Sequence, residues 1–552
     1  MARRIDTDVL IVGGGPVGLT LGMDLARRGV EVMLVEMRAP GEPPNGRCNV
    51  VSARTMEAFR RLDIAGAVRD AGLPAEYPND VAIRTTATGI EFARIRIPCR
   101  AERYTAKVGP DTWWPTPEPP HRINQIYLEP VLFAAAAAAP GLRILNRTQV
   151  SSFQRHADGV LAVARNLARG STHEILARYV VGCDGAHSEV RRAIGATLSG
   201  DAALMRAQST YVRAPALLDM MPSKAWAIDC INPRSRGLIF AIDGLEKWIV
   251  HKFVELDQSF TSDREQSVRE ILGVPRCFAF EVLGQEDWIG RRLIASRFRE
   301  RRIFLCGDAA HIWVPFAAYG MNAGIADAMN LSWMLAASIK GWAHPSLLDA
   351  YEIERRPITD QVSRHAMNIA LNWNKRYGPV PDDIEQPGPE GEAVRSRVGR
   401  LAYDIAVAGF CCGGLNFGYF YEGSPVIAYD GEAPPCYTLY DFKQSTVPGC
   451  RTPHLWLRDG RSLYDALGPD FTLLRFDPKI DVSVLANSAK RRGVPMEVLD
   501  VDADEAAALY PYKLLLSRPD QHVAWRGDMP PHDCMALIDR VRGATARMQL
   551  NG

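Results

Sequence analysis

The chain has 552 residues, 47% of them hydrophobic and 23% charged, and its 65 Lys and Arg nearly balance its 64 Asp and Glu. This length exceeds one ordinary core and predicts two or three structural units. The formal net charge of +1 argues against a nucleic-acid partner or an anionic membrane surface, and no uninterrupted apolar run approaches the roughly 18 residues of a membrane span.

The 11 cysteines are scattered and odd in number, and no two of them form a Cys-x-x-Cys motif. This spacing predicts neither a zinc site nor a dithiol redox centre. The apolar run over residues 9–12 is too short for a secretory signal and ends in glycines. We therefore expect no metal and a cytoplasmic location.

The first elements in chain order form a strand, loop, helix, strand pattern. A strand is predicted over 8–12, the glycine-rich loop covers 13–18, a helix follows over 19–28, and a second strand over 30–35 ends at Glu36. A Gly-x-Gly-x-x-Gly motif between strand and helix, followed by an acidic residue that ends the next strand, is typical of dinucleotide binding.

Each glycine of this loop has a physical task. Gly13 makes the tight turn, Gly15 lets backbone N–H groups approach a pyrophosphate, and Gly18 lets the helix pack on the strand. Glu36 is placed to accept hydrogen bonds from an adenosine ribose. Because FAD and NAD share the ADP half, this loop alone does not choose between them.

Polar residues further along the chain fall where a cofactor can be contacted. Arg47 and Arg54 precede a helix and can reach phosphate or flavin oxygens, although two solvated arginines fit these positions equally well. Gln125 opens an alanine-rich helix. A buried strand over 180–183 runs into Asp184-Gly185, which also fits a plain turn.

A second strand, loop, helix unit lies in the middle of the chain. A short apolar strand in the stretch 302–306 stops at the Gly307-Asp308 turn, a loop containing Pro315 follows, and a helix is predicted over 321–335. The N-terminus of such a helix presents unpaired N–H groups and the positive end of a dipole, so it favours a negative charge. An anionic reduced flavin would be such a charge.

The pattern changes to short alternating strands over 80–103 and again over 199–290. We expect these strands to form an antiparallel sheet. Trp226 and Phe240 can line an aromatic pocket there, although aromatic residues on strands are more often ordinary core.

Four motifs occur in a fixed order along the chain. They are Gly13-x-Gly15-x-x-Gly18 with Glu36; Arg47 with Arg54-Thr55-Met56-Glu57; Asp184-Gly185-x-x-Ser188-x-Val190-Arg191; and Gly307-Asp308-Ala309-Ala310-His311 with Gly320-Met321-Asn322. Together they resemble the single-component, class A flavin-dependent aromatic hydroxylases, a family of FAD-binding monooxygenases, and in particular its phenol-hydroxylase-like branch. The resemblance covers nearly the whole chain.

The resemblance implies an α/β fold of three units. They are a Rossmann-like FAD-binding domain of the glutathione-reductase type (1–79, 104–198 and 291–375), an antiparallel-sheet substrate-binding domain (80–103 and 199–290) and, after a linker (376–400), a thioredoxin-like C-terminal domain (401–552). Because the last unit lacks Cys-x-x-Cys, its expected use is packing and dimerisation rather than redox chemistry. We therefore expect a homodimer.

The resemblance also implies a reaction. FAD would be reduced by transiently bound NADH or NADPH, dioxygen would add to give a C4a-hydroperoxyflavin, and one oxygen atom would pass to a phenolic or related aromatic compound. The residues expected to bind FAD are Gly13, Gly15, Pro16, Val17, Gly18, Glu36, Met37, Arg38, Arg47, Gln125, Asp184, Gly185, Gly307, Asp308, Pro315, Gly320, Met321 and Asn322.

The chain departs from this family at the position of the catalytic base. Relatives that hydroxylate phenols carry Asp or His five residues before the position of Arg54, where this chain has Asn49, and an amide cannot take a proton at neutral pH. Either another group acts as base, or the substrate is activated differently. We expect Asn49 and Pro315 to act at the catalytic centre, with the substrate bordered by Asn49, Trp226, Phe240 and Phe316.

Other functions remain open. Oxygen insertion or epoxidation on a polycyclic or polyketide-like substrate is favoured by Asn49. A flavoprotein reductase that never activates dioxygen would keep the same nucleotide motifs, and so would a non-catalytic FAD-binding protein. Oxygen consumption linked to a product separates the first two functions from the reductase, and any turnover excludes the last.

Overall fold

The structure is a computed structural model, and it describes residues 3–44, 48–254, 256, 259–260, 263–314, 318–377, 379–502, 506 and 508–544, without the side chains of 3–5, 202–204 and 372–377. Arg47, Pro315 and Phe316 lie outside the described residues. The expectations for these three positions therefore stay predictions.

The first sheet is mainly parallel, with the strand order β16–β17–β10–β1–β2–β7 and a β8–β9 hairpin attached to β10. Val9, Leu10 and Ile11 in its centre are fully buried, as expected for a parallel sheet covered on both faces. Its strands are β1 (Arg3–Val12), β2 (Val32–Val35), β7 (Leu142–Leu145), β8 (Thr148–His156), β9 (Gly159–Asn166), β10 (Thr172–Gly182), β16 (Arg299–Glu300) and β17 (Ile303–Leu305).

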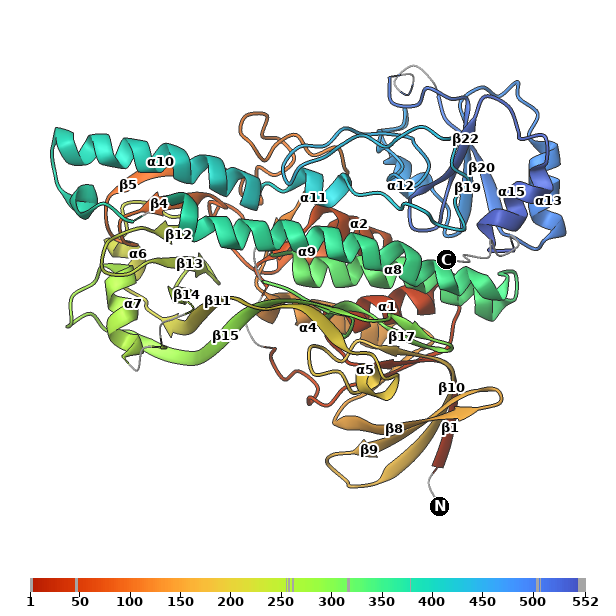
Figure 1. Cartoon of the computed structure of the whole chain (residues 1–552), viewed down its shortest axis with the longest axis horizontal. Coiled ribbons are helices and arrows are strands. Elements are labelled where there is room, and N and C mark those ends of the chain that lie inside the picture. Colours follow the sequence, from red (N-terminus) through yellow and green to blue (C-terminus); the bar gives the residue numbers. More distant parts are fainter. Residues whose placement is uncertain are drawn as a thin grey trace.

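Helices α1 and α8 pack against each other on this sheet, and α9 follows α8 along the middle of the molecule (Figure 1). Gly324 of α8 lies so close to the first sheet that a Cβ there would be 2.9 Å from the Gly307 Cα. The helices of this unit are α1 (Pro16–Arg27), α2 (Ala53–Arg61), α3 (Ala65–Asp70), α4 (Gln125–Ala138), α5 (Glu189–Ala193), α8 (Tyr319–Lys340) and α9 (Ala350–Tyr377), with short 3-10 turns η1 (Gly307–Ala309) and η3 (Pro345–Asp349).

The second sheet has the order β18–β15–β11–β14–β13–β12–β4–β5 and is antiparallel except between β12 and β4. One face packs on α7 and the other is covered by α10, which Figure 1 shows on opposite sides of the strands. Its strands are β4 (Val81–Arg84), β5 (Glu91–Ile95), β11 (Leu198–Arg213), β12 (Ala227–Cys230), β13 (Gly237–Ala241), β14 (Lys247–Val254), β15 (Glu281–Ala295) and β18 (His311–Ile312).

The helical elements beside this sheet are α6 (Leu217–Met220), α7 (Arg264–Leu272), α10 (Pro389–Phe410), α11 (Gly413–Phe417) and the 3-10 turn η4 (Asp382–Glu385). A two-stranded ribbon of β3 (Val50–Val51) and β6 (His121–Arg122) lies between the first two units. The stretch 376–400, expected as a linker, thus contains η4 and the first half of a helix that covers the second sheet.

The C-terminal unit contains a mixed sheet in the order β20–β19–β21–β22, in which β19 and β20 are parallel and the other pairs antiparallel. Figure 1 shows it beside the ends of α8 and α9. Its elements are α12 (Leu463–Ala466), β19 (Phe471–Arg475), α13 (Ser483–Arg491), β20 (Met496–Asp500), β21 (Leu514–Ser517), β22 (Val523–Gly527) and α15 (Cys534–Val541).

One stretch in the described part of the chain, Pro389–Phe417, is long and apolar enough to cross a membrane by length and composition alone. In this structure 61% of its apolar window is buried inside the molecule, where Ala402 and Ile405 pack against Ile83 of the second sheet. The apolar character of α10 is therefore accounted for by core packing.

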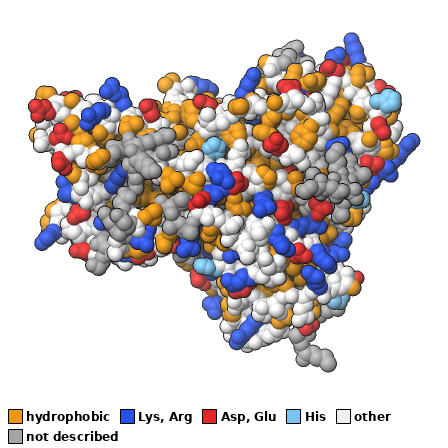
Figure 2. All heavy atoms as spheres, viewed as in Figure 1, with side chains coloured by type: hydrophobic (Ala, Val, Ile, Leu, Met, Phe, Trp, Pro, Cys, Tyr) orange, Lys and Arg blue, Asp and Glu red, His pale blue; other side chains and the backbone are white. Residues whose placement is uncertain are grey.

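Basic and acidic side chains are interspersed over the face shown in Figure 2.

The elements predicted from the sequence are confirmed, with shifted ends. The predicted strands over 8–12, 30–35 and 180–183 fall in β1, in β2 and at the end of β10. The helix predicted over 321–335 is α8, which begins earlier, at Tyr319, because Ala318 before it takes a left-handed conformation with φ of 51°.

Candidate active site

The residues predicted to hold a nucleotide meet at one edge of the first sheet. Strands β17, β10, β1 and β2 run parallel to one another. Gly307, Asp184, Gly13 and Glu36 follow the carboxyl ends of these four strands. Ligands of open parallel sheets bind outside this edge.

The three motif glycines of the first loop meet different surroundings. A Cβ on Gly13 would be 2.3 Å from the Cys183 carbonyl oxygen, and one on Gly18 would be 2.0 Å from the Gly13 oxygen. A Cβ on Gly15 would meet nothing within 4 Å. Only Gly15 therefore opens to free space, at the N-terminus of α1, where no side chain caps the helix.

This arrangement fits the pyrophosphate of a dinucleotide. The first turn of α1 offers unpaired backbone N–H groups and the positive end of the helix dipole. Gly15 leaves room for a ligand that a side chain would fill. The described residues at this edge are consistent with FAD.

The acidic residue at the end of β2 is held by its own surroundings. The Gly14 N–H donates to Glu36 Oε2 at 2.6 Å, and the Arg38 N–H donates to Glu36 Oε1 at 2.8 Å. The Arg38 side chain continues to Glu129, which accepts a further hydrogen bond from Gln125. Burial alone would raise the pKa of Glu36, but these contacts outweigh it and hold the pKa below its ordinary value, so the carboxylate stays ionised. Met37, between them, is exposed.

The two Gly-Asp motifs are tied together by Arg191. Its guanidinium donates to the Ala309 carbonyl oxygen at 3.0 Å and to that of Ala186 at 2.7 Å. The Asp184 carboxylate accepts from the Ser188 hydroxyl and the Val190 N–H, and burial raises its pKa above the ordinary value. Asp308 is exposed at the sheet edge.

A buried carboxylate on α8 fixes the second Gly-Asp loop from behind. Asp327 accepts from the Gly307 N–H at 3.2 Å and from Arg355 Nε at 2.7 Å, and it lies 2.7 Å from His311 Nε2. Burial would raise the pKa of Asp327, but Arg355 and His311 hold it below its ordinary value. Of these residues the sequence motif contained Gly307 and His311, and the structure shows that His311, Asp327 and Arg355 position the loop rather than face the open edge.

The start of α8 is held by the amide of Asn322. Its Nδ2 donates to the carbonyl oxygens of Ala318 at 2.7 Å and Val50 at 3.0 Å, while Oδ1 accepts from the Ser52 N–H. The Asn322 side chain thus clamps the loop before α8 to the start of α2.

Asn49 lies next to this clamp, just before β3. It is buried, and its Oδ1 accepts a 2.6 Å hydrogen bond from Asn124 Nδ2. Asn124 in turn caps α4 through the Ile126 N–H. The carbonyl side of Asn49 is therefore used in holding β3 to α4.

The face of the second sheet that α10 covers carries a row of aromatic and polar groups. Directly paired residues on neighbouring strands share a face, so Ser209, His251, Leu238 and Asp229 form one row across β11, β14, β13 and β12. We call this face the floor. At the β15 side its Met205 packs with Val314, which follows β18.

Trp226 and Phe240 meet at the other side of the floor with ring centroids 5.0 Å apart. Arg122 of β6 lies over the Trp226 ring at 4.8 Å. His251 stands edge-on to Phe240, and its Nδ1 lies 2.7 Å from the Ser209 hydroxyl, which also accepts from Trp288. Burial lowers the pKa of His251 to about 4, so its ring is neutral at pH 7.

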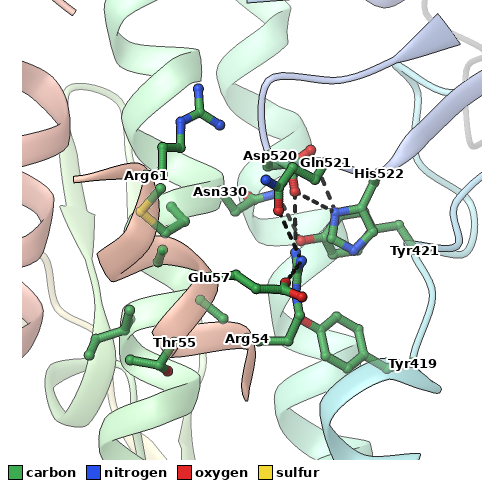
Figure 3. A pocket seen from close by; sticks show the side chains of 14 residues that line it. Arg54, Thr55, Glu57, Arg61, Asn330, Tyr419, Tyr421, Asp520, Gln521 and His522 are labelled. Atoms are coloured by element: carbon green, nitrogen blue, oxygen red, sulfur yellow. Dashed lines mark hydrogen bonds and ion pairs between the residues drawn. The ribbon is translucent and has the colours of Figure 1, made fainter. Parts of the chain in front are cut away.

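A small polar pocket lies away from this edge, between α2, α8 and the C-terminal unit (Figure 3). Arg54 reaches across it, pairing with Glu57 at 2.6 Å and donating to Gln521 Oε1 at 3.1 Å and the Asp520 carbonyl oxygen at 3.3 Å. Of the two uses weighed for Arg54, cofactor contact or solvent exposure, the structure shows neither, because the side chain holds α2 to the C-terminal unit.

Sequence reasoning missed Asp229, His251, Ser209 and Trp288 on the floor. Asp229 interrupts the apolar run 225–231, and His251 interrupts the apolar strand 248–254. A titratable residue inside an otherwise apolar strand is the feature of the sequence that could have marked Asp229 and His251 as candidates. The faces on which they lie depend on strand register, which only the structure supplies.

Comparison with known proteins places this geometry in context. The family described as "FAD binding domain" matches residues 6–366, and that described as "Aromatic-ring hydroxylase, C-terminal" matches residues 445–546. The tetracenomycin B2 monooxygenase-dioxygenase of Streptomyces olivaceus is 31% identical over 571 residues, covering 98% of each chain. The phenol 2-monooxygenase of Pseudomonas sp. (strain EST1001) is 28% identical over 98% of this chain and 93% of its own.

Among solved structures, the rebeccamycin biosynthetic enzyme RebC with reduced flavin superposes with a TM-score of 0.89. It is 34% identical, and the match covers 98% of this chain and all of that one.

Proposed function

This chain belongs to the family of FAD-dependent monooxygenases of the aromatic-ring hydroxylase type, and on that premise we propose that it inserts one oxygen atom into a polycyclic phenol, with NADH or NADPH as reductant. The observation that carries the substrate class is the floor. It is apolar and aromatic in the middle and polar at two separated places, Asp229 and His251.

The spacing of these polar groups supports a substrate of several fused rings. Asp229 and His251 are two strands apart, about 10 Å at the usual strand spacing. Leu238 lies between them, and Phe240 is two residues along the same strand on the same face. A single-ring phenol is the second candidate, favoured by the similarity to phenol 2-monooxygenase.

FAD, when bound and reduced by the nicotinamide, supplies the activation of dioxygen. The chain's own residues bind and orient it. The N–H groups at the start of α1 hold the pyrophosphate, and Glu36 binds the ribose. The Gly307-Asp308 and Asp184-Gly185 turns contact the remaining part of FAD that faces the sheet edge. Asn322 acts through its backbone, since its side chain is already engaged. Asn49 borders the substrate as a hydrogen-bonding group, and Trp226 and Phe240 exclude water from the floor.

We also propose the domain division expected from the sequence, supported by the three separate sheets. The mixed sheet of the C-terminal unit, with α13 and α15 packed together beside it, supports a thioredoxin-like fold. A cytoplasmic location is supported by the eleven cysteines, all in the described part of the chain and all free. A homodimer rests on the family resemblance.

The test uses purified, yellow protein mixed with NADH or NADPH in air, against single-ring phenols and hydroxylated polycyclic aromatics. We expect one polycyclic phenol to accelerate nicotinamide oxidation and to gain one oxygen atom by mass spectrometry. Oxygenation of single-ring phenols alone would move the proposal to the second candidate. Flavin reduction without any oxygenated product would contradict it in favour of a reductase.

A further inference from the structure

A second cavity lies beside the pocket of Figure 3, and the two share Arg54, Ala326 and Tyr419 on their walls. The other described residues that line it come from the first turns of α8, from α9 and from the stretch after β18. We call it the α8–α9 cavity. Its volume for the centre of a water-sized sphere is about 10 Å³, so it has space for one particle of about that size.

Three residues that line this cavity each carry a buried donor atom without a partner. Trp313 Nε1, Arg355 Nη1 and Thr359 Oγ1 form no hydrogen bond with any described residue. Arg355 and Thr359 are four residues apart on α9, so they lie on one face of that helix, and both are 1% exposed. Because an unpaired buried polar group costs free energy, three of them around one cavity indicate a ligand.

The chemistry of these donors favours an anion. An indole N–H and a guanidinium N–H can only donate, and a hydroxyl can donate as well. Among the described residues that line the cavity, two are arginines and none is Asp or Glu. The amide oxygen of Asn322 on the same wall already accepts from the Ser52 N–H. A water molecule would bring two hydrogens that need acceptors, whereas a monoatomic anion accepts from all three donors.

The surroundings strengthen such contacts. Arg54 pairs with Glu57, and Arg355 Nε donates to Asp327 at 2.7 Å, but neither carboxylate is on the wall of the cavity. The bond to Asp327 leaves Arg355 Nη1 available. Apolar side chains such as Ile358 complete the wall, and hydrogen bonds from a charged donor to an anion are stronger in such a setting of low dielectric.

We propose that the α8–α9 cavity is a binding site for a halide ion such as chloride. The ion accepts hydrogen bonds from Trp313 Nε1, Arg355 Nη1 and Thr359 Oγ1. It thereby joins the stretch after β18 to α9, beside the first turns of α8. The halide is a structural ligand that takes part in no covalent or redox step, so this inference does not depend on the proposed function.

Crystals of the full-length, FAD-loaded protein soaked in bromide test the site directly. We expect an anomalous bromide peak within hydrogen-bond distance of the three donor atoms. Density without an anomalous signal would mean that water occupies the cavity, and either that result or the absence of any peak would overturn the proposal.

Two variants test whether the ion binds in solution. Trp313→Phe removes one donor but keeps an aromatic ring against His311, on which Trp313 stacks with ring centroids 4.8 Å apart. Thr359→Val removes a second donor with little change of shape. Trp342→Phe is the matched control, because Trp342 Nε1 is also buried without a partner among the described residues but does not line the cavity.

The Tm of each FAD-loaded protein is measured in chloride and in methanesulfonate, a monovalent anion too large for the cavity, at equal ionic strength. We expect chloride at ten times its Kd to raise the Tm of wild type and W342F by about 1–3 °C relative to methanesulfonate. W313F and T359V should each lose at least half of this shift. T359V and the wild-type crystals decide the matter if W313F does not fold.

An equal chloride shift in wild type and in the cavity variants would overturn the proposal. This holds even if the crystals show a bromide peak, because the ion would then bind at soaking concentration only.

Discussion

Gly15, the N-cap of α1, and Gly18 in its first turn lie three residues apart, yet a methyl group added to each would meet opposite surroundings. At Gly18 it would sit 2.0 Å from the Gly13 carbonyl oxygen, and at Gly15 it would meet open space. Gly15 also has φ of −75°, a backbone conformation that alanine adopts freely. The absence of a side chain at Gly15 thus leaves space for a ligand, whereas its absence at Gly18 allows the fold to pack.

The variants Gly15→Ala and Gly18→Ala should therefore separate binding from folding. We expect G15A to leave the stability of the FAD-free protein within about 0.5 kcal/mol, since it is a strain-free change. Its added methyl group should weaken FAD by about 10- to 100-fold, since overpacking costs about 1–3 kcal/mol. G18A should instead lower the stability of the FAD-free protein. Flavin fluorescence titration and urea unfolding measure the two effects, and an unchanged FAD affinity in G15A would contradict this use of the loop.

The raised pKa of Asp229 also predicts how stability depends on pH. A carboxyl group whose pKa is higher in the folded protein, about 6 against 3.8, contributes stability at low pH that is lost as the pH rises through that interval. About 2 pKa units at about 1.4 kcal/mol each give about 3 kcal/mol. Asp229→Asn should therefore gain about 2 kcal/mol relative to wild type between pH 4 and pH 7, because the unfolded carboxyl is already partly ionised at pH 4. Urea unfolding at both pH values measures this difference, and an unchanged difference would show that the carboxyl is not buried as described.

At the scale of elements, α8 and α9 are joined to the C-terminal unit by a fully buried ionic network. Arg518 donates to both oxygens of Glu354 at 2.6 and 2.8 Å and to Asp520. Asn330 of α8 donates to Glu354 and Asp520 as well. Removing one member would leave an uncompensated charge inside the protein.

Glu354→Gln should accordingly destabilise the protein by about 3–5 kcal/mol, the usual result of breaking a buried pair from one side. Asp500→Asn is the control, because the Asp500 side chain of the Arg475–Asp500 pair is about half exposed and the loss of such a surface pair should cost about 0–1 kcal/mol. Chemical unfolding followed by tryptophan fluorescence distinguishes them. Equal effects of the two changes would mean that the network contributes no more than a surface pair.

The extent to which this site could be predicted follows from how local each signal is. The loop 13–18 and Glu36 were predictable because their spacing within 24 residues carries the whole argument. The role of Arg191 was not, since its partner Ala309 lies 118 positions away in the 3-10 turn η1. That Asp229 and His251 lie on one face of the second sheet was not predictable for the same reason, because two strand pairings bring them together. The earlier start of α8 depends on the left-handed Ala318, which no pattern of apolar residues indicates.

At the scale of the whole molecule, the units share helices rather than merely touching. Helix α9 spans Ala350–Tyr377, about 42 Å at 1.5 Å per residue. Along this length Glu354 accepts from Arg518 of the C-terminal unit, Arg355 donates to Asp327 behind the second Gly-Asp loop, and Ala366 packs near Met205 of the second sheet. Cofactor binding at the first sheet should therefore stabilise all three structural units.

We expect FAD at 100 times its Kd to stabilise the native protein by about 2.7 kcal/mol and to raise one shared melting transition by a few degrees. Riboflavin, which lacks the ADP half recognised by the loop 13–18, should give a smaller shift. Differential scanning calorimetry measures both. Two separate transitions, only one of which responds to FAD, would contradict the coupling of the units.

The Glu354–Arg518–Asp520 network also restricts how such enzymes can exchange parts during evolution or engineering. A C-terminal unit transplanted from a relative brings its own residues to positions 518 and 520 but meets Glu354 of the host helix. Recombination would therefore succeed only when all three residues are inherited together. The crossover point for a working chimera is set by this triad rather than by the boundary between sheets.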